Sequence, residues 1–209
     1  MTDEEAAAAL EAVVRQQPRA VPPWVPVTDY SFTARQTVEG IHPQLIKDVF
    51  HPRHVLDCGA GPGHLVMLLR ALGVEASGID VMPHVDQWVF QEDLTHLARW
   101  PSPRADLVVC REVLEHLPLL GLRRAIFNLA RLTWRYVYVT TRFAQSPAHV
   151  LSVETHDDLD PSHISMLTKP FVRALFILEG CRSRPDLEAK MDHQHKGRVL
   201  VFDVDGGAS

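Results

Sequence analysis

Hydrophobic and polar positions along the chain follow two patterns, short apolar runs and longer segments with helical spacing. The segment 64–72 has four leucines at i, i+3, i+4 and i+7, which predicts an amphipathic helix. The run HVLDC at 54–58 is short and stops at glycines, which predicts a buried strand. The same patterns predict further strands at 74–79, 88–91, 106–110, 136–141 and 198–204, and further helices at 112–117, 121–133 and 169–179.

The segment before residue 54 has a different character. Residues 1–17 are Ala-rich and predict a short helix, whereas residues 18–28 carry four prolines, which cannot continue a helix. Helical spacing resumes over 34–50 and is interrupted near Pro43. We therefore expect an N-terminal helix with a Pro-rich linker or lid at 1–33, one domain at 34–205 and a flexible tail at 206–209.

Strands that alternate with helices indicate an α/β fold, in which a mostly parallel sheet carries helices on both faces. A chain of 209 residues fits one such domain with a substantial core. Ligands of these sheets bind at the carboxyl ends of the strands, where the strand order changes direction. We therefore expect the functional residues in the turns that follow the strands.

The turn after the first of these strands is rich in glycine, with the sequence DCGAGPGH over 57–64. Glycines at such a turn permit positive φ and let a ligand approach the backbone closely. The third glycine comes one residue earlier than in the dinucleotide fingerprint GxGxxG, and Pro62 lacks a backbone N–H. The spacing therefore disfavours a NAD-binding oxidoreductase and favours a ligand without a pyrophosphate.

The segment VLDCGAGPGHL at 55–65 resembles motif I of class I S-adenosyl-L-methionine (SAM)-dependent methyltransferases. The resemblance extends over roughly residues 35–204 and implies a Rossmann-like fold with a seven-stranded, mostly parallel sheet whose last strand is antiparallel. It also implies SAM as the cofactor and S-adenosyl-L-homocysteine (SAH) as the product. Transfer of a methyl group to a small-molecule acceptor, by O- or N-methylation, is the expected activity.

The same resemblance assigns cofactor contacts residue by residue. The loop from Asp57 to Gly63 lies along the amino-acid part of SAM, Asp80 accepts hydrogen bonds from the ribose hydroxyls, and Asp93 accepts one from the adenine amino group. Leu94 lies beside the adenine ring, and Cys110 and Arg111 line the floor of the site near the sulfonium. The full expected set is Asp57, Gly59, Gly61, Gly63, His64, Asp80, Val81, Asp93, Leu94, Cys110 and Arg111.

The acceptor side is expected at the ends of the fourth and fifth strands. Because the methyl group of a sulfonium is already activated, the protein must align the acceptor, exclude water and remove a proton where the acceptor carries one. On a helix over 112–117, Glu112 shares one face with His116, and both are candidate catalytic residues together with His163. The candidate substrate residues are Arg142, which suits a carboxylate or phosphate, and also Tyr30 and His156.

Two alternatives remain open. The pattern Glu112-x-x-Glu115-His116 with the distant His163 resembles the site of Hen1-type RNA 2′-O-methyltransferases, in which two Glu and two His hold a divalent ion. The sequence around His163 lacks the aromatic and acidic surroundings expected of Hen1, so we assign no metal ligand. Because no unmistakable catalytic motif is present, the second alternative is a catalytically silent, SAM-binding scaffold subunit.

Composition narrows the expected partners and setting. With 21 Lys and Arg against 26 Asp and Glu, the net charge of −5 disfavours nucleic acid as a partner. Three widely spaced Cys without a CxxC pair fit reduced thiols in a cytoplasmic protein, and the chain has neither a secretory signal nor an apolar run long enough for a membrane span. We expect a monomer or homodimer, and we place the pair His193 and His195 in a solvated loop away from the pocket.

Overall fold

The computed structural model describes residues 42–82, 87–97, 104–144 and 163–204. All of them belong to the compact unit Ala34–Ser209. The predictions for the segments 1–17 and 18–28 and for the tail 206–209 lie outside the described residues. The same holds for the candidate substrate residues Tyr30 and His156.

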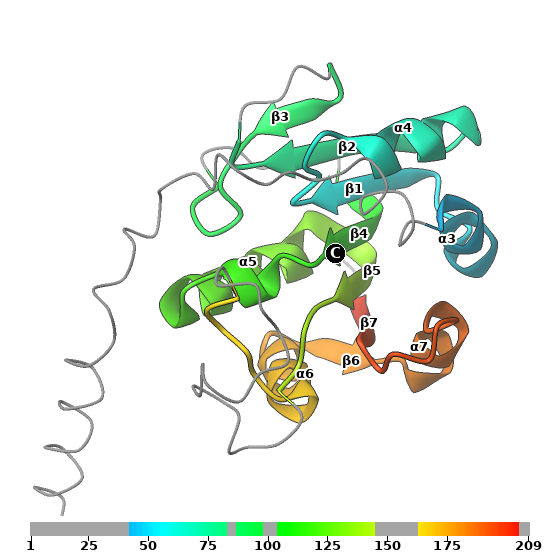
Figure 1. Cartoon of the computed structure of the whole chain (residues 1–209). Coiled ribbons are helices and arrows are strands. Elements are labelled where there is room, and N and C mark those ends of the chain that lie inside the picture. The colour runs from blue at the N-terminus through cyan, green and yellow to red at the C-terminus, as the bar shows by residue number, and fades with distance from the viewer. Residues whose placement is uncertain (1–41, 83–86, 98–103, 145–162, 205–209) are drawn as a thin grey trace, which may run out of the picture. The chain divides into compact units, whose positions relative to one another are not determined.

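The centre of the structure is a seven-stranded sheet with the order β3-β2-β1-β4-β5-β7-β6 (Figure 1). The strands β1 to β5 pair in parallel, and β7 is antiparallel to both of its neighbours. The predicted fold, a mostly parallel sheet with an antiparallel last strand, is therefore confirmed. The strands are β1 His54–Cys58, β2 Glu75–Asp80, β3 Val89–Gln91, β4 Ala105–Arg111, β5 Thr133–Thr140, β6 Cys181–Ser183 and β7 Val199–Val204.

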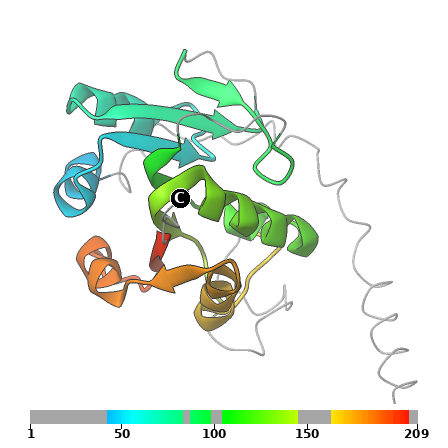
Figure 2. The ribbon, with the colours of Figure 1, turned by 180° about the vertical axis from the view of Figure 1, so that it is seen from behind.

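Helices cover both faces of this sheet. On one face lie α5 (Leu119–Leu132) and α6 (Lys169–Leu178), whose buried residues join one hydrophobic cluster with β4 and β5, including the stacked rings of Phe176 and Phe202 at 4.3 Å. On the other face lie α3 (Pro43–Phe50), α4 (His64–Ala71) and α7 (Pro185–Met191), which share a second cluster with the opposite sides of the strands. Figure 2 shows the same arrangement from behind.

The central strands form because their sequences suit burial on two faces. In β4, every residue from Ala105 to Cys110 is buried, as expected of a strand between two helical layers. β5 begins at Thr133, three residues before the predicted start, and the Thr133 hydroxyl donates to the carbonyls of Ala105 and Asp106. The strand β6 and the helix α7 were not predicted, because both are too short to show a period.

One predicted helix is wrong, and this changes the expected acceptor side. Over 112–117 the chain forms only a 3-10 turn, η1 (Leu114–His116), and Glu112 has a left-handed φ of 50°. The backbone N–H of Glu112 donates to the carbonyl of Thr140 at 2.8 Å, so the chain turns sharply on leaving β4. Glu112 therefore does not share a helix face with Glu115 and His116.

A second correction concerns the loop between α7 and β7. Because β7 runs antiparallel to β5, with Val199 opposite Thr140, this loop joins the sheet at the edge where β5 ends. Its His193 ring lies 3.8 Å from the ring of His42, which directly precedes α3. Both His193 and His195 are exposed, as predicted, but the loop does not lie at the edge far from the candidate site.

Candidate functional site

The glycine loop after β1 is held against the end of β2. The N–H groups of Gly59 and Ala60 donate to the carbonyl of Ile79 at 2.8 and 3.1 Å. The three loop glycines, Gly59, Gly61 and Gly63, have φ values of 81°, 51° and 82°, a region that other residues rarely adopt. A Cβ on Gly59 would also overlap the side chain of Val113, so sterics alone require glycine there.

Gly61, two residues further along the loop, lies in more open surroundings. A Cβ on Gly61 would meet no atom within 4 Å, so this part of the backbone faces open space. Its N–H donates to Asp80 Oδ2 at 2.8 Å, and Asp80 Oδ1 accepts from Met82 N at 2.9 Å. Each carboxylate oxygen has a second lone pair, so Asp80 can hold the loop and still accept from two ribose hydroxyls. The loop and Asp80 therefore fit the cofactor.

Asp57 lies beneath this loop and is almost fully buried. The pKa of its carboxyl group is raised to about 7, mainly by burial, against the opposing effect of the Arg111 guanidinium and with a smaller contribution from the nearby Asp80. Burial also raises the pKa of Tyr138, on β5 beyond β4, to about 12, again opposed by Arg111. Arg111 thus lies on the same face of the sheet as Asp57, close to the glycine loop.

The loop after β3 is fixed by its own side chains. Asp93 Oδ1 accepts from both the N–H and the hydroxyl of Thr95 at 2.7 Å, and Asp93 Oδ2 lies 3.6 Å from His96 Nδ1. The expected adenine contact of Asp93 is thereby left to Oδ2. Leu94 is only 7% exposed and packs in the core, and its carbonyl accepts from Asn128 Nδ2. The side chain of Leu94 therefore packs mainly in the hydrophobic core and offers little surface to an adenine ring.

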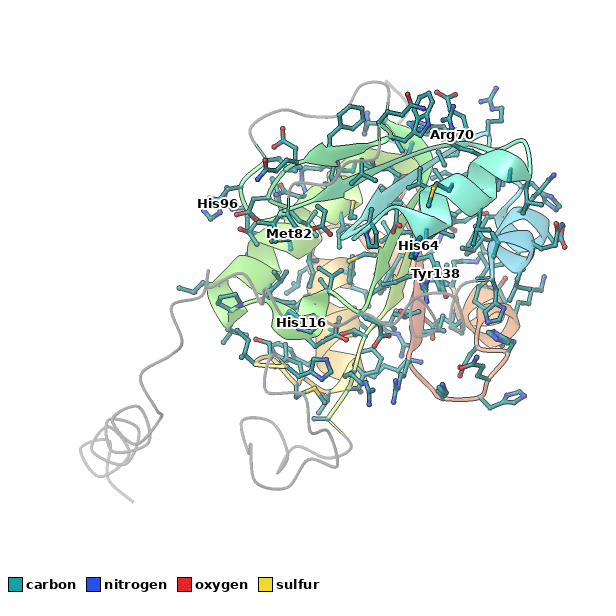
Figure 3. The ribbon with its side chains drawn as sticks, turned by 45° about the horizontal axis from the view of Figure 1, so that its top comes forward. His64, Arg70, Met82, His96, His116 and Tyr138 are labelled. Atoms are coloured by element: carbon teal, nitrogen blue, oxygen red, sulfur yellow. The ribbon has the colours of Figure 1, made fainter. Side chains whose placement is uncertain are left out.

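The other expected cofactor residues divide by exposure. Val81 is 47% exposed directly after Asp80, whereas Cys110 is fully buried. We therefore withdraw the contact expected between Cys110 and the sulfonium, since none of its surface is accessible. His64 begins α4, and its buried Nδ1 has no hydrogen-bond partner among the described residues. Figure 3 shows His64 and His116 on α4 and η1, which follow β1 and β4.

The acceptor-side candidates come together around η1. The rings of His116 and His163 lie 4.8 Å apart, although they belong to distant parts of the sequence. Arg142 Nε lies 3.9 Å from Glu112 Oε2, which pairs the side chains that follow β5 and β4. The structure thus brings the two catalytic candidates His116 and His163 side by side and places Glu112 with Arg142.

Glu115 is the residue of this region that the sequence analysis undervalued, naming it only for the metal alternative. It has no exposed surface, and burial together with the neighbouring Glu112 raises the pKa of its carboxyl group to about 8. Ligand atoms of Glu115, His116 and His163 lie within 4.8 Å of one another. Among the described residues, Glu112 is not part of this group, although its carboxyl group lies within hydrogen-bonding reach of that of Glu115. The motif EVLEH at 112–116 can be recognised in the sequence, but the burial of Glu115 cannot be predicted from it.

The fold and the glycine loop define the class, a Rossmann-like class I methyltransferase. The family model described as a methyltransferase domain matches residues 32–181. The chain belongs to this methyltransferase family, which confirms the resemblance seen in the loop and, with it, SAM as the cofactor. No curated protein matches the chain.

Solved structures of other proteins share this fold. Magnesium protoporphyrin IX methyltransferase from Synechocystis PCC 6803, solved with bound SAM, is 19% identical with a TM-score of 0.53 over 81% of this chain and 78% of that one. A 1,6-didemethyltoxoflavin-N1-methyltransferase from Burkholderia thailandensis is 13% identical with a TM-score of 0.54 over 97% and 90%. The 4+2 cyclase SpnF is 12% identical with a TM-score of 0.56 over 77% and 78%. At these identities the likeness shows the fold alone.

Proposed function

We propose that the protein transfers the methyl group of SAM to an oxygen or nitrogen atom of a small-molecule acceptor, and releases SAH. The observation that carries the proposal is the juxtaposition at the carboxyl edge of the sheet. There the N–H of Gly61, beside open space, donates to Asp80 after β2. His116 follows β4, and its ring lies beside that of His163. The small molecules named for the similar methyltransferases from Synechocystis and Burkholderia thailandensis support an acceptor of this size.

On the cofactor side, the protein supplies a shaped backbone and three carboxyl groups. The positive φ values of the loop glycines bring the chain close to the amino-acid part of SAM. Asp80 accepts the ribose hydroxyls, Asp93 the adenine amino group, and the buried Asp57 supports the loop from below. Arg111, close to Asp57, supplies the balancing positive charge.

On the acceptor side, the protein aligns the acceptor and receives its proton. Bound SAM supplies a methyl group that is already activated towards attack. A hydroxyl acceptor loses its proton as the new bond forms, and an imidazole nitrogen of His116 or His163 is placed to accept it. Arg142, held near Glu112, is placed to meet an anionic group of the acceptor. An amine acceptor uses the same pair to take the proton after transfer.

The experiment that tests the proposal measures binding before turnover. Isothermal titration of the purified chain with SAM, SAH and NAD is expected to show binding of the first two only. Asp80→Ala is expected to weaken SAM binding, because it removes the ribose acceptor and frees Gly61 N. The matched control is Glu75→Ala, at the opposite end of the same strand and exposed. Binding of NAD, or full SAM affinity in Asp80→Ala, contradicts the proposal.

A second candidate is metal-assisted methylation of an RNA ribose, which the grouping of Glu115, His116 and His163 supports. The net charge of −5 counts against it. A chelator distinguishes the two, since only the metal-assisted reaction requires an ion. The scaffold alternative predicts SAM binding with no turnover on any acceptor. The proposal retains a monomer or homodimer in the cytoplasm, a setting that the three free cysteines favour.

A helix that crosses a membrane must be both long and apolar. No helix in the part of the chain that the structure describes is both long and apolar enough to cross a membrane.

A further inference from the structure

A single buried side chain links the ends of two strands beneath the acceptor side. Glu115, on η1 after β4, has no exposed surface. Its Oε2 accepts a hydrogen bond from the hydroxyl of Thr141 at 2.7 Å, and its Oε1 accepts a longer one from the N–H of Arg142 at 3.4 Å. Because Thr141 and Arg142 directly follow β5, these bonds fix the exit of β5 to the exit of β4.

The backbone of the same residue holds a third segment. The carbonyl of Glu115 accepts from the N–H of Ser165 at 2.9 Å, and the hydroxyl of Ser165 donates to the carbonyl of Leu117. The N–H of Ala144 donates to the carbonyl of Leu167 at 2.9 Å, which ties the β5 exit to this third segment. The three segments therefore form a closed set of hydrogen bonds, and Glu115 contributes to two of its three sides.

The two histidines lie on this frame. His116 follows Glu115 directly, and His163 lies two residues before Ser165. The hydrogen bonds from Ser165 to the carbonyls of Glu115 and Leu117 therefore join the two segments that carry these rings, which lie 4.8 Å apart. We propose that Glu115 is a positioning residue that holds His116 and His163 side by side. The inference rests on the proposed function for its purpose, but its geometry can be tested without any acceptor.

The residue type suits this task. A carboxyl group offers two oxygens at the spacing needed to accept from the Thr141 hydroxyl and the Arg142 N–H together. A buried donor left without an acceptor is costly, so loss of Glu115 would drive Thr141 and Arg142 to reorient. Glutamine keeps one oxygen acceptor and offers an N–H₂ that the Thr141 hydroxyl oxygen can accept. Glu115→Gln is therefore the conservative variant, whereas Glu115→Ala also opens a cavity.

The test uses the full-length protein and nuclear magnetic resonance of its histidine rings. The signature is the cross-peak between imidazole protons of His116 and His163, assigned by single His→Gln variants. Thr141→Val removes the hydroxyl without changing the side-chain shape, and it is expected to abolish the cross-peak. Thr141→Ser and Glu115→Gln are expected to retain it. Thr133→Val is the matched control, because it removes a buried hydroxyl bonded to two carbonyls at the other end of β5.

The outcomes separate positioning from general stability and from the proposed function. Similar losses of melting temperature in Thr141→Val and Thr133→Val, with the cross-peak lost only in Thr141→Val, support the inference. Retention of the cross-peak in Thr141→Val overturns it, as does its loss in Thr133→Val. Titration with Mn²⁺ that broadens both rings in the wild type but not in Glu115→Gln also overturns it, because Glu115 would then be a metal ligand. Failure to bind SAH refutes the proposed function and leaves the cross-peak result unaffected.

Discussion

Three glycines with positive φ lie in different surroundings, and this allows backbone strain, steric overlap and ligand contact to be measured separately. The φ values are 81° at Gly59, 51° at Gly61 and 78° at Gly73, which lies in the turn between α4 and β2. An added Cβ overlaps Val113 at Gly59 but meets no atom within 4 Å at Gly61 or Gly73. Alanine therefore adds backbone strain at all three positions, and it adds steric overlap only at Gly59. At Gly61 it also obstructs the proposed ligand contact.

The expected losses of unfolding free energy follow from these surroundings. A left-handed φ costs an alanine about 1–2 kcal/mol, and the reduced entropy of the unfolded chain offsets about 0.4–1 kcal/mol of this. Gly73→Ala and Gly61→Ala are therefore expected to lose about 1 kcal/mol each. Gly59→Ala must also displace Val113, and overpacking of this kind adds about 1–3 kcal/mol. Its total loss is therefore expected at about 3 kcal/mol.

Urea unfolding and titration with SAH measure the two consequences. In Gly59→Ala/Val113→Ala, the second substitution removes the overlapping methyl groups, so the double variant is expected to lose less stability than the two single losses added together. Gly61→Ala is expected to match Gly73→Ala in stability but to bind SAH at least about tenfold more weakly, a change of about 1.4 kcal/mol. Gly73→Ala is expected to bind SAH as the wild type does.

Two results would refute this reasoning. If Gly59→Ala loses no more stability than Gly73→Ala, the overlap with Val113 is relieved by a small movement and does not explain the glycine. If Gly61→Ala binds SAH with wild-type affinity, the open space beside Gly61 is not the cofactor site, and the resemblance in the loop does not locate the ligand.

Further predictions concern pH, catalysis and metal. The pKa of Asp57 is raised from 3.8 to about 7 in the folded state, so the folded state retains a proton that the unfolded state has lost. The stabilisation by the protonated Asp57 is present below about pH 4 and is lost as pH rises to about 7. The free energy of unfolding is therefore expected to fall by up to about 4 kcal/mol over this range. In urea unfolding, Asp57→Asn is expected to remove this pH dependence. His163→Ala is expected to lower turnover with a competent acceptor while titration shows unchanged SAM affinity; unchanged turnover would remove His163 from the site. Methyl transfer is expected to continue in excess chelator, and its loss there with recovery on added Mg²⁺ or Mn²⁺ would favour the metal-assisted alternative.

The sheet and the cofactor loop could be predicted because their signals are local. β1 and β4 are short segments of mostly apolar residues, and the glycines of the loop follow β1 directly. Apart from β6 and α7, which are too short to show a period, the departures depend on contacts between distant residues. Glu112 fits a helical period, but its N–H is taken by the carbonyl of Thr140, which forces a left-handed turn. Likewise, nothing within the sequence near Cys110 or Leu94 indicates that packing against α5 makes both core residues.

The two halves of the candidate site differ in the same way, because one is built from local turns and the other from contacts between distant segments. The cofactor side consists of turns that directly follow β1, β2 and β3, and its main tie, from Gly61 to Asp80, joins adjacent strands. In the proposed function, the acceptor side is assembled from η1, the exit of β5 and the segment before α6. These segments meet through apolar packing of Leu114, Phe143 and Leu167 and through tertiary hydrogen bonds such as that from Thr141 to Glu115. The two halves still meet at Val113, directly before η1, whose side chain lies where a Cβ on Gly59 would be placed. In the proposed function, substitutions at the exit of β5 or in the segment before α6 are therefore expected to alter the alignment of the acceptor with less effect on the glycine loop than substitutions at Val113.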